Sequence, residues 1–556
     1  MHYLAGRHSK RMNKTLRTIL LAILLASGTT VSLPAYALKY DLSEGFTEPT
    51  DGSLKVMLLK NGNTAMLNIT PKDGIFIKLF DANRKSIAEK NHESEVWESG
   101  KMKRAEIKGV YEIDGNIVLF VQHMLNKTPV LFRLIIDGKN GAMLKEEKIG
   151  ELHKYSIGDG YAMLFGGVQA DNFHIVKDDY SDNYAVVHFT GFEPDRSKRI
   201  QVVHYNKQHQ EISRAYFSSP DNQFKYLNYV GMVVLGDKSV LVTAYGFNTA
   251  SSGGKDSRLI VSKLEKGSTA FKHKLLEFSD DFMDTKAIMR YNPKTDVVAL
   301  LSITRISTKQ RFLSSTSTTT YMPLLTFIDP NSFSLLKVAQ LQTPKLDELA
   351  RKNDYKDGFT GLPQDMYVNS NNTYTIVAEE ITQQIIQYSR TSRTVTYLGN
   401  MGVSTMDGNG NEIAASFIPK SQMVKASLYR EMYVNERKNT AQDVSYGNQF
   451  LSFSYAEGKN TGYIFVNDYE KNAEALRKGK IYTVTTISGT DAFCHVLQNG
   501  GAQREYVFGN PDGKKDKRFA MFSVSDYKPE THTYATIMID KEGGSKTAKI
   551  AWLYLD

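Results

Sequence analysis

Residues 405–413 read TMDGNGNEI: an apolar run ends, a turn of Asp, Gly and Asn follows, and a new run begins. Asp and Asn side chains bond the backbone two residues on, and Gly and Asn tolerate positive φ, so this composition predicts a tight turn between two strands. Similar turns recur about every 66 residues. Their first polar residues are Asp81, Asp137, Asn206, Glu265, Asp329, Asp407, Asn467 and Asp540, with Glu265 and Asn467 the poorer matches.

The runs between these turns have the composition of β-strands. They are rich in Val, Ile, Thr, Tyr and Phe, and Gly, Asn or Asp bounds them, as in residues 117–121, 184–189, 240–245 and 450–455. Only residues 345–353 and 469–479 have a helical pattern. The sequence therefore predicts an all-β protein rather than a parallel sheet covered by helices.

The repeat predicts the arrangement of the strands. Most turns have a further strand upstream, which gives three or four strands per unit, and repeated units of this kind describe a β-propeller. We expect six to eight blades, with seven as the central value because one hairpin could belong to a ring closed by both termini. Tandem β-sandwich domains are the alternative, although no Pro- or Ser-rich linker divides the chain.

The first 37 residues have the order of a signal peptide. Basic residues precede the apolar run ILLAILLA at residues 19–26, and an A-x-A cleavage site stands at residues 35–37. Met12 is a second candidate for the start. The apolar run is about half the ~20 residues that a membrane-spanning helix needs. We therefore expect cleavage, no membrane span in the mature chain, and a single propeller domain over residues 38–556. The expected location is periplasmic, outer-surface or secreted.

Cleavage also changes the charge. The whole chain of 556 residues carries 69 Lys and Arg against 60 Asp and Glu, and residues 1–37 hold five of the basic residues and none of the acidic ones. The mature chain thus has a net charge of only +4. Nucleic-acid binders usually show a basic stripe with exposed aromatic residues, which is missing here, so no nucleic-acid partner is expected.

Motifs for catalysis and metal binding are missing. There is no G-x-S-x-G elbow and no H-E-x-x-H pair. Cys494, the single cysteine, stands beside His495, but adjacent residues of a strand point to opposite faces. The Asp407 turn resembles the start of a calcium loop, yet its sixth position is not Gly and its twelfth, Ile418, is not Glu. The sequence predicts no metal site and no cofactor.

Two acidic stretches are the candidate binding sites. Each places three carboxylates in a short loop just before a strand, where they could bind a cation or a basic group, or act as acid and base. Solvated turns are the alternative interpretation. The residues are Asp178, Asp179 and Asp182 in the first stretch, and Asp280, Asp281 and Asp284 in the second.

The export signal, the loose repeat and turns such as residues 406–413 (MDGNGNEI) resemble the uncharacterised secreted β-propeller-like proteins of Bacteroidota, a domain of unknown function. This resemblance covers nearly all of the mature chain and implies no catalytic residues. A repeat scaffold with long loops and no catalytic motif favours a non-enzymatic role. We expect binding of an envelope protein or a glycan, with a hydrolase or lyase that acts on polysaccharide through its loop carboxylates as the alternative.

Overall fold

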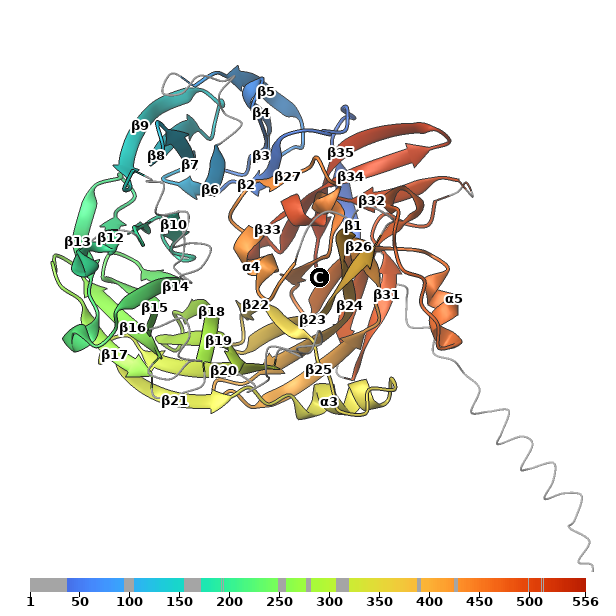
Figure 1. Cartoon of the computed structure of the whole chain (residues 1–556). Coiled ribbons are helices and arrows are strands. Elements are labelled where there is room, and N and C mark those ends of the chain that lie inside the picture. The colour runs from blue at the N-terminus through green and yellow to red at the C-terminus, as the bar shows by residue number, and fades with distance from the viewer. Residues whose placement is uncertain are drawn as a thin grey trace, which may run out of the picture. The chain divides into compact units, whose positions relative to one another are not determined.

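The computed structural model describes residues 38–556 except 95–104, 155–171, 192, 194, 249–256, 277–281, 307–319, 388–391, 425–428, 499, 512 and 514. Within this part of the chain, eight antiparallel sheets follow one another around a ring and form a β-propeller (Figure 1). The propeller prediction is confirmed over the tandem β-sandwich alternative. The central value of seven blades is wrong, because the blade closed by both termini adds to the seven formed within the chain.

Each of the first four blades contains a four-stranded meander, and in blade 1 a fifth strand, β27 (Gln442–Asp443), also pairs with β2. Blade 1 contains β2 (Ser53–Leu58), β3 (Thr64–Thr70), β4 (Gly74–Phe80) and β5 (Ser86–His92), and blade 2 contains β6 (Glu106–Ile113), β7 (Asn116–Leu125), β8 (Thr128–Asp137) and β9 (Met143–Glu151). Blade 3 contains β10 (Asn172–Lys177), β11 (Tyr184–Phe189), β12 (Ile200–Tyr205) and β13 (Glu211–Phe217), and blade 4 contains β14 (Tyr226–Leu235), β15 (Ser239–Phe247), β16 (Arg258–Glu265) and β17 (Lys272–Leu276).

Of the later blades, 5 and 7 have four strands, whereas 6 and 8 have five. Blade 5 contains β18 (Phe282–Asn292), β19 (Val297–Ile306), β20 (Thr320–Asp329) and β21 (Ser334–Gln340), and blade 6 contains β22 (Leu362–Val368), β23 (Tyr374–Gln387), β24 (Ser392–Met406), β25 (Glu412–Ile418) and β26 (Gln422–Val424). Blade 7 contains β28 (Phe453–Glu457), β29 (Gly462–Asp468), β30 (Asp491–Gln498) and β31 (Gly501–Tyr506). Blade 8 contains β32 (Lys517–Ala520), β33 (Asp526–Lys528), β34 (Thr533–Glu542), β35 (Ser545–Tyr554) and, from the start of the chain, β1 (Lys39–Leu42).

In the part of the chain that the structure describes, helices are few and short, as expected. The predicted helices at 345–353 and 469–479 are found as α3 (Pro344–Arg351) and α5 (Asn472–Arg477), whereas α4 (Tyr433–Arg437) was not predicted. Single 3-10 turns lie at η2 (Arg196–Lys198), η3 (Pro220–Asn222), η4 (Asn448–Phe450), η5 (Ile487–Gly489), η6 (Phe522–Val524) and η7 (Pro529–Thr531). None of the described helices has both the length and the apolar content to cross a bilayer.

The repeated turns occupy two positions in the blades. Six of them, from Asp81 to Asp407, join the third and fourth strands of blades 1 to 6, and the side chain of Asp407 accepts from the backbone N of Asn409 and Asn411, both at 2.8 Å. Asn467 instead lies at the end of β29, before β30, and these are the second and third strands of blade 7. Asp540 lies near the end of β34, before β35, and these two are the middle strands in the sheet order β1-β35-β34-β32 of blade 8. The turn chemistry was thus predicted well, but the turns do not all mark the same place in a blade.

Among the described residues, eight of the ten hydrophobic clusters lie one between each pair of neighbouring blades, and the other two are smaller. Each blade is buried on both faces, which explains why its strands read as continuous apolar runs. Between blades 8 and 1 the fully buried Trp552 packs against Phe80 and donates to Thr64 Oγ1 at 2.8 Å. Because β1 pairs with β35, with Lys39 opposite Tyr554, this last blade joins the two ends of residues 38–556.

Residues 429–450, here the central segment, leave the regular pattern and run along the inner strands (Figure 1). Their backbone pairs with several blades. Met432 N donates to Pro363 O of blade 6, Val110 N of blade 2 donates to Asn439 O, and β27 (Gln442–Asp443) pairs with β2 of blade 1. Side chains connect the central segment to two further blades. Lys286 of blade 5 forms an ion pair with Glu436, and Arg437 donates to Phe453 O of blade 7. The central segment therefore ties both halves of the ring together.

Candidate binding site

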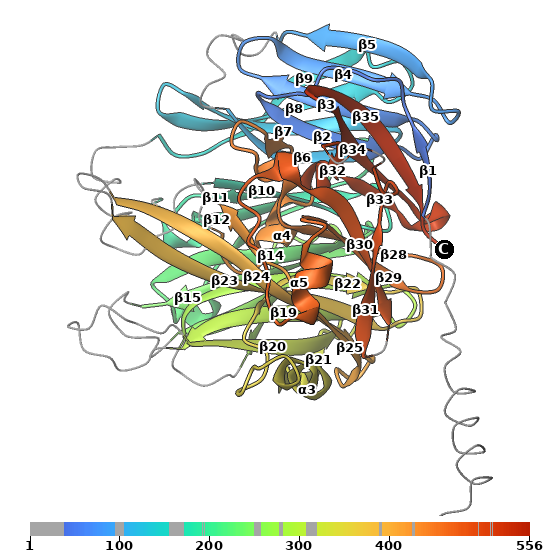
Figure 2. The same cartoon turned by 90° about the vertical axis from the view of Figure 1, so that its right-hand side faces the viewer.

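The ring has two faces with different connections. We call the side where the first strand joins the second, and the third joins the fourth, the turn face; its connections in blades 1 to 6 are two to six residues long. The opposite side, the loop face, carries the joins between second and third strands and between blades, which include 20 residues between β9 and β10, 21 between β21 and β22 and 22 between β29 and β30. Figure 2 shows the ring from the side.

The first acidic stretch lies on the turn face, between β10 and β11. Asp178 is buried, and its carboxylate accepts from Tyr180 N at 3.1 Å, Ser181 Oγ at 2.6 Å and Gly236 N of blade 4 at 2.9 Å. Asp179 is exposed. Asp178 thus holds its own turn and joins blade 3 to blade 4.

Asp182 joins other blades. Its carboxylate lies 2.7 Å from Lys60 Nζ of blade 1 and 3.3 Å from Lys177 Nζ, and it accepts from Asp114 N of blade 2. Burial alone would raise the pKa of Asp182, but the hydrogen bond from Lys60 and the charges of both lysines outweigh burial and hold the pKa below its ordinary value. Asp182 therefore stays ionised in an ion-pair network.

Polar contacts of this kind run around the whole turn face and join every neighbouring pair of blades. From blade 1 onward they are Lys60 N to Glu112, Asp114 N to Asp182, Gly236 N to Asp178, Lys263 Nζ to Asn331 O, Lys294 Nζ to Ser370 O, Ser370 N to Glu457, Tyr527 to Glu457 O and Lys528 Nζ to Leu59 O. The turn face thus fastens the ring.

The second acidic stretch is only partly described. Asp280 and Asp281 lie outside the described residues, and Asp284 lies near the start of β18, although nothing is described of its side chain. The innermost strands begin at the loop face and end at the turn face, so Asp284 and the stretch 178–182 lie at opposite ends of these strands. The structure does not bring the two stretches together.

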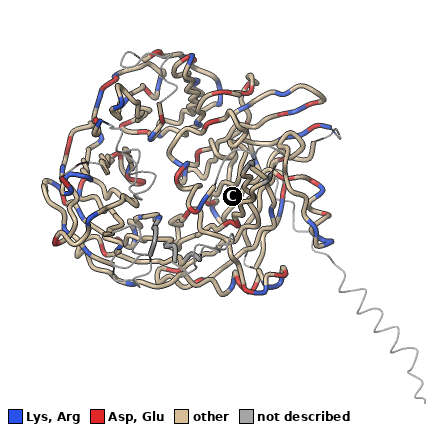
Figure 3. Tube along the Cα trace, in the orientation of Figure 1, with Lys and Arg blue, Asp and Glu red and all other residues tan. Residues whose placement is uncertain are grey.

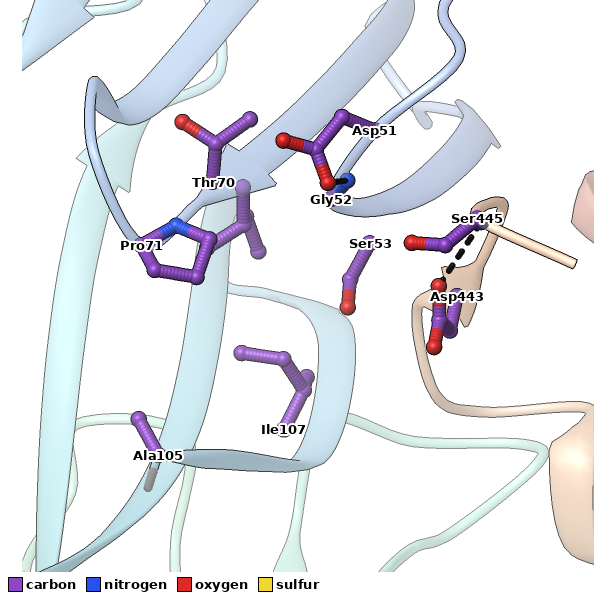
Figure 4. A pocket seen from close by; sticks show the side chains of 10 residues that line it. Asp51, Gly52, Ser53, Thr70, Pro71, Ala105, Ile107, Asp443 and Ser445 are labelled. Atoms are coloured by element: carbon purple, nitrogen blue, oxygen red, sulfur yellow. Dashed lines mark hydrogen bonds between the residues drawn. The ribbon is translucent and has the colours of Figure 1, made fainter. Parts of the chain in front are cut away.

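A pocket on the loop face combines residues far apart in the sequence (Figure 4). It encloses about 530 Å³ of empty space, part of it open to solvent. Its lining comes from the start of β2, the end of β3, the start of β6 and β27 of the central segment. The polar lining residues are Asp51, Ser53, Thr70, Asp443 and Ser445, and the apolar ones are Ile69, Pro71, Ala105 and Ile107.

Backbone geometry fixes the positions of the polar side chains that line this pocket. Ser53 and Asp443 are directly opposite in the β2–β27 pair, so their side chains share one face. Gly52 has a φ of +86°, and a Cβ there would lie 2.6 Å from Ile69 O, so only glycine fits beside Asp51. Each carboxylate uses one oxygen locally: Asp51 accepts from Gly52 N, and Asp443 accepts from Ser445 N, both at 2.8 Å.

The pocket can bind a ligand with hydroxyl groups. Among the residues that the structure describes, two carboxylates and three side-chain hydroxyls line it without a Lys or Arg, and the adjacent Tyr446 has 69% of its surface exposed. Sequence reasoning missed it because Asp51 and Asp443 come together only through the β2–β27 pair. The one local signal was Asp51-Gly52 before a strand, which by itself indicates a turn.

Among the described residues, burial shifts the pKa values of Cys494 and several histidines outside the pocket. Burial raises the pKa of Cys494 to about 12 and lowers that of His495 to about 3, so both are neutral. Burial also lowers the pKa of His174, which stacks on Tyr229, to about 3. Ser262 Oγ lies 2.7 Å from His273 Nδ1, but Ser262 is fully buried. Among the residues the structure describes, no group of His, Cys, Asp and Glu could hold a metal ion.

Comparison with known proteins identifies no family for the chain. No protein-family model matches the sequence, and neither does any curated protein. Similar solved structures include the polysaccharide lyase Uly1, with 10% identity and a TM-score of 0.37 over 81% of this chain and 90% of that one.

Two other solved structures are similar at the same level. The GH93 α-L-arabinofuranosidase of Fusarium graminearum has 10% identity and a TM-score of 0.31 over 69% of this chain and 93% of that one. A DUF4221 family member from Bacteroides vulgatus has 11% identity and a TM-score of 0.29 over 72% and 93%. With TM-scores this low, the similarities carry no argument about family or function.

Proposed function

We propose that the protein is exported and acts as a non-enzymatic binding protein, with a glycan of the envelope or its surroundings as ligand. The observation that carries the proposal is the pocket between blades 1 and 2, where Asp51 and Asp443 flank Ser53. Carboxylates accept strong hydrogen bonds from hydroxyl groups, which sugars present in number. A concave surface on which a few polar groups converge is a common form of small-ligand site.

The surroundings of the pocket support the same ligand class. Exposed Tyr446 offers an aromatic surface beside Ser445, and an amphipathic ring of this kind suits a ligand with both apolar and hydroxyl edges. The expected signal cleavage after residue 37 leaves β1 intact, because β1 begins at Lys39. The chain that remains after the expected cleavage therefore still contains β1, the strand that closes the ring.

A glycan array followed by calorimetry on the mature chain tests the proposal. We expect a glycan to bind, and Asp51→Asn together with Asp443→Asn to weaken it at least tenfold, since charged acceptors are lost at the ligand. Asp357→Asn, at an exposed carboxylate outside the pocket, is the matched control and leaves binding unchanged. Absence of any glycan ligand, or equal binding by the pocket variant, contradicts the proposal.

The alternative function is a polysaccharide-acting hydrolase or lyase that uses loop carboxylates. One observation favours keeping it: Asp179 is exposed on the turn face, so its carboxylate is accessible to a substrate. Asp178 and Asp182 are already engaged in holding the ring, so catalysis would depend on Asp179 or on the second stretch. Release of reducing or unsaturated ends from polysaccharide, abolished by Asp179→Asn without a change in thermal stability, is the result this alternative requires.

A further inference from the structure

The 22 residues between β29 and β30 form a lobe on the loop face of blade 7. Residues 469–490, here the α5 lobe, contain α5, η5 and the turn between them. The buried side chain of Asn472 donates to Asp468 Oδ1 at 2.7 Å and to Tyr482 O at 3.0 Å, and it accepts from Tyr482 N at 2.8 Å. The backbone on both sides of α5 is therefore held in a fixed position on blade 7.

The α5 lobe presents three basic side chains without acidic partners. Lys471, Arg477 and Lys480 are exposed, and among the described residues no Asp or Glu lies within ion-pair distance of them. Figure 3 shows Lys and Arg in blue along this part of the chain, where it stands out from the ring. Because α5 has six residues, it is only about 9 Å long, so the three cations share one small surface.

The acidic residues of the same stretch do not cancel this charge, because each already has a basic partner. Glu474 lies 2.6 Å from Lys478 Nζ, and Glu470 lies 3.9 Å from Lys517 Nζ. Exposed cations that are left unpaired on a fixed surface attract anions. The lobe is therefore suited to a negatively charged partner.

We propose that the α5 lobe binds an acidic polysaccharide, which carries carboxylate groups along a chain of sugar rings. Lysine and arginine attract carboxylates, and arginine can donate two parallel hydrogen bonds to one carboxylate. Tyr482, with 49% of its surface exposed, adds an aromatic surface against which a sugar ring can pack. Lys471 Nζ lies 4.0 Å from the centre of that ring, so a cation and the aromatic surface are side by side.

Two features separate this proposal from its alternatives. No Leu, Ile or Val of the α5 lobe, all of which is described, is exposed, whereas segments that dock on a membrane bury such side chains in the lipid. The lobe belongs to blade 7 and not to the pocket between blades 1 and 2, so the proposal does not depend on the glycan proposed for that pocket.

Affinity measurements of the mature chain with polygalacturonate, and with uncharged dextran for comparison, test this proposal. We expect polygalacturonate to bind, dextran not to bind, and binding to weaken as salt is added, because ions screen exposed charges. Lys471→Gln, Arg477→Gln and Lys480→Gln together should raise the dissociation constant on the order of tenfold, since each exposed ion pair contributes modestly.

Three exposed lysines of the turn face provide a matched control. Lys85→Gln, Lys139→Gln and Lys238→Gln together remove the same net charge from the opposite face and should leave the dissociation constant nearly unchanged. Both triple variants alter exposed side chains only, so they should keep the melting temperature of the natural chain. A loss of binding at an unchanged melting temperature is then a property of the altered surface.

Three outcomes overturn the proposal. One is that polygalacturonate does not bind. Another is an equal loss in the two triple variants, which assigns binding to the net charge of the chain. The third is tighter binding to phosphatidylglycerol vesicles than to polygalacturonate, which assigns the α5 lobe to a membrane surface.

Discussion

The two faces of the ring use carboxylates in opposite ways. On the turn face, Asp178 and Asp182 are engaged by donors from neighbouring blades and hold the ring together. On the loop face, Asp51 and Asp443 each give one oxygen to a neighbour in sequence and border an open pocket. Acidic residues that cluster in sequence therefore mark a structural turn, whereas those that converge only in space mark the candidate site.

The largest expected change in stability concerns a buried ion pair that contacts the central segment, which also supplies part of the pocket. Lys420 Nζ lies 2.5 Å from Glu379 Oε1, with both side chains essentially inaccessible, and Glu379 also accepts from Tyr433 of α4 at 2.6 Å. Lys420→Met leaves the Glu379 carboxylate buried without its cation, which should lower the free energy of unfolding by about 3–5 kcal/mol. Denaturant unfolding measures this loss.

A double variant serves as the control for that prediction. Glu379→Gln combined with Lys420→Met removes both charges, so it should cost clearly less than Lys420→Met alone. Equal losses in the single and double variants would show that side-chain packing, rather than the unpaired charge, accounts for the effect.

The next effect tests the turn face directly. Asp178→Ala leaves the backbone N–H groups of Tyr180 and Gly236 without their acceptor, which should cost about 2–3 kcal/mol of unfolding free energy. Asp179→Ala in the same turn is the matched control, and as a change at an exposed site it should stay within about 0.5 kcal/mol. Similar melting temperatures for the two variants would remove the structural role assigned to Asp178.

A smaller effect at Asp182 depends on pH. The pKa of Asp182 is held below the ordinary value near 3.8, so its ionised form stabilises the fold above that value, and this contribution is lost as the pH falls through the lower folded pKa. Asp182→Asn should lower the free energy of unfolding by about 1 kcal/mol at neutral pH. The difference in unfolding free energy between the natural chain and this variant should narrow below about pH 4. A gap that stays constant down to pH 2 contradicts the ion-pair role.

Local chemistry explains what the sequence could predict. The Asp and Asn turns, the strands and both longer helices depend on neighbours within a few residues, and they were found close to where they were expected. The blade count was one short because closure by both termini was expected to use up one of the eight hairpins, whereas β1 only adds a strand, over 500 positions from its partner Tyr554, to a blade that β32, β34 and β35 already form. The pocket was missed because β27 is two residues long and reaches blade 1 from beyond blade 6.

The smallest expected change in stability is at the pocket. Asp51→Asn with Asp443→Asn keeps the size of both side chains, and each amide oxygen can still accept from the neighbouring backbone N–H, so unfolding free energy should change by less than about 1 kcal/mol. Ligand binding should nevertheless fall at least tenfold.

Asp178→Ala should show the reverse: a less stable ring with unchanged ligand affinity at temperatures where it is folded. If loss of binding followed loss of stability in every variant, the division of roles between the two faces would be wrong. If the pocket variant alone lost binding, the loop face would be the site, because its carboxylates would then act on the ligand and not on the ring.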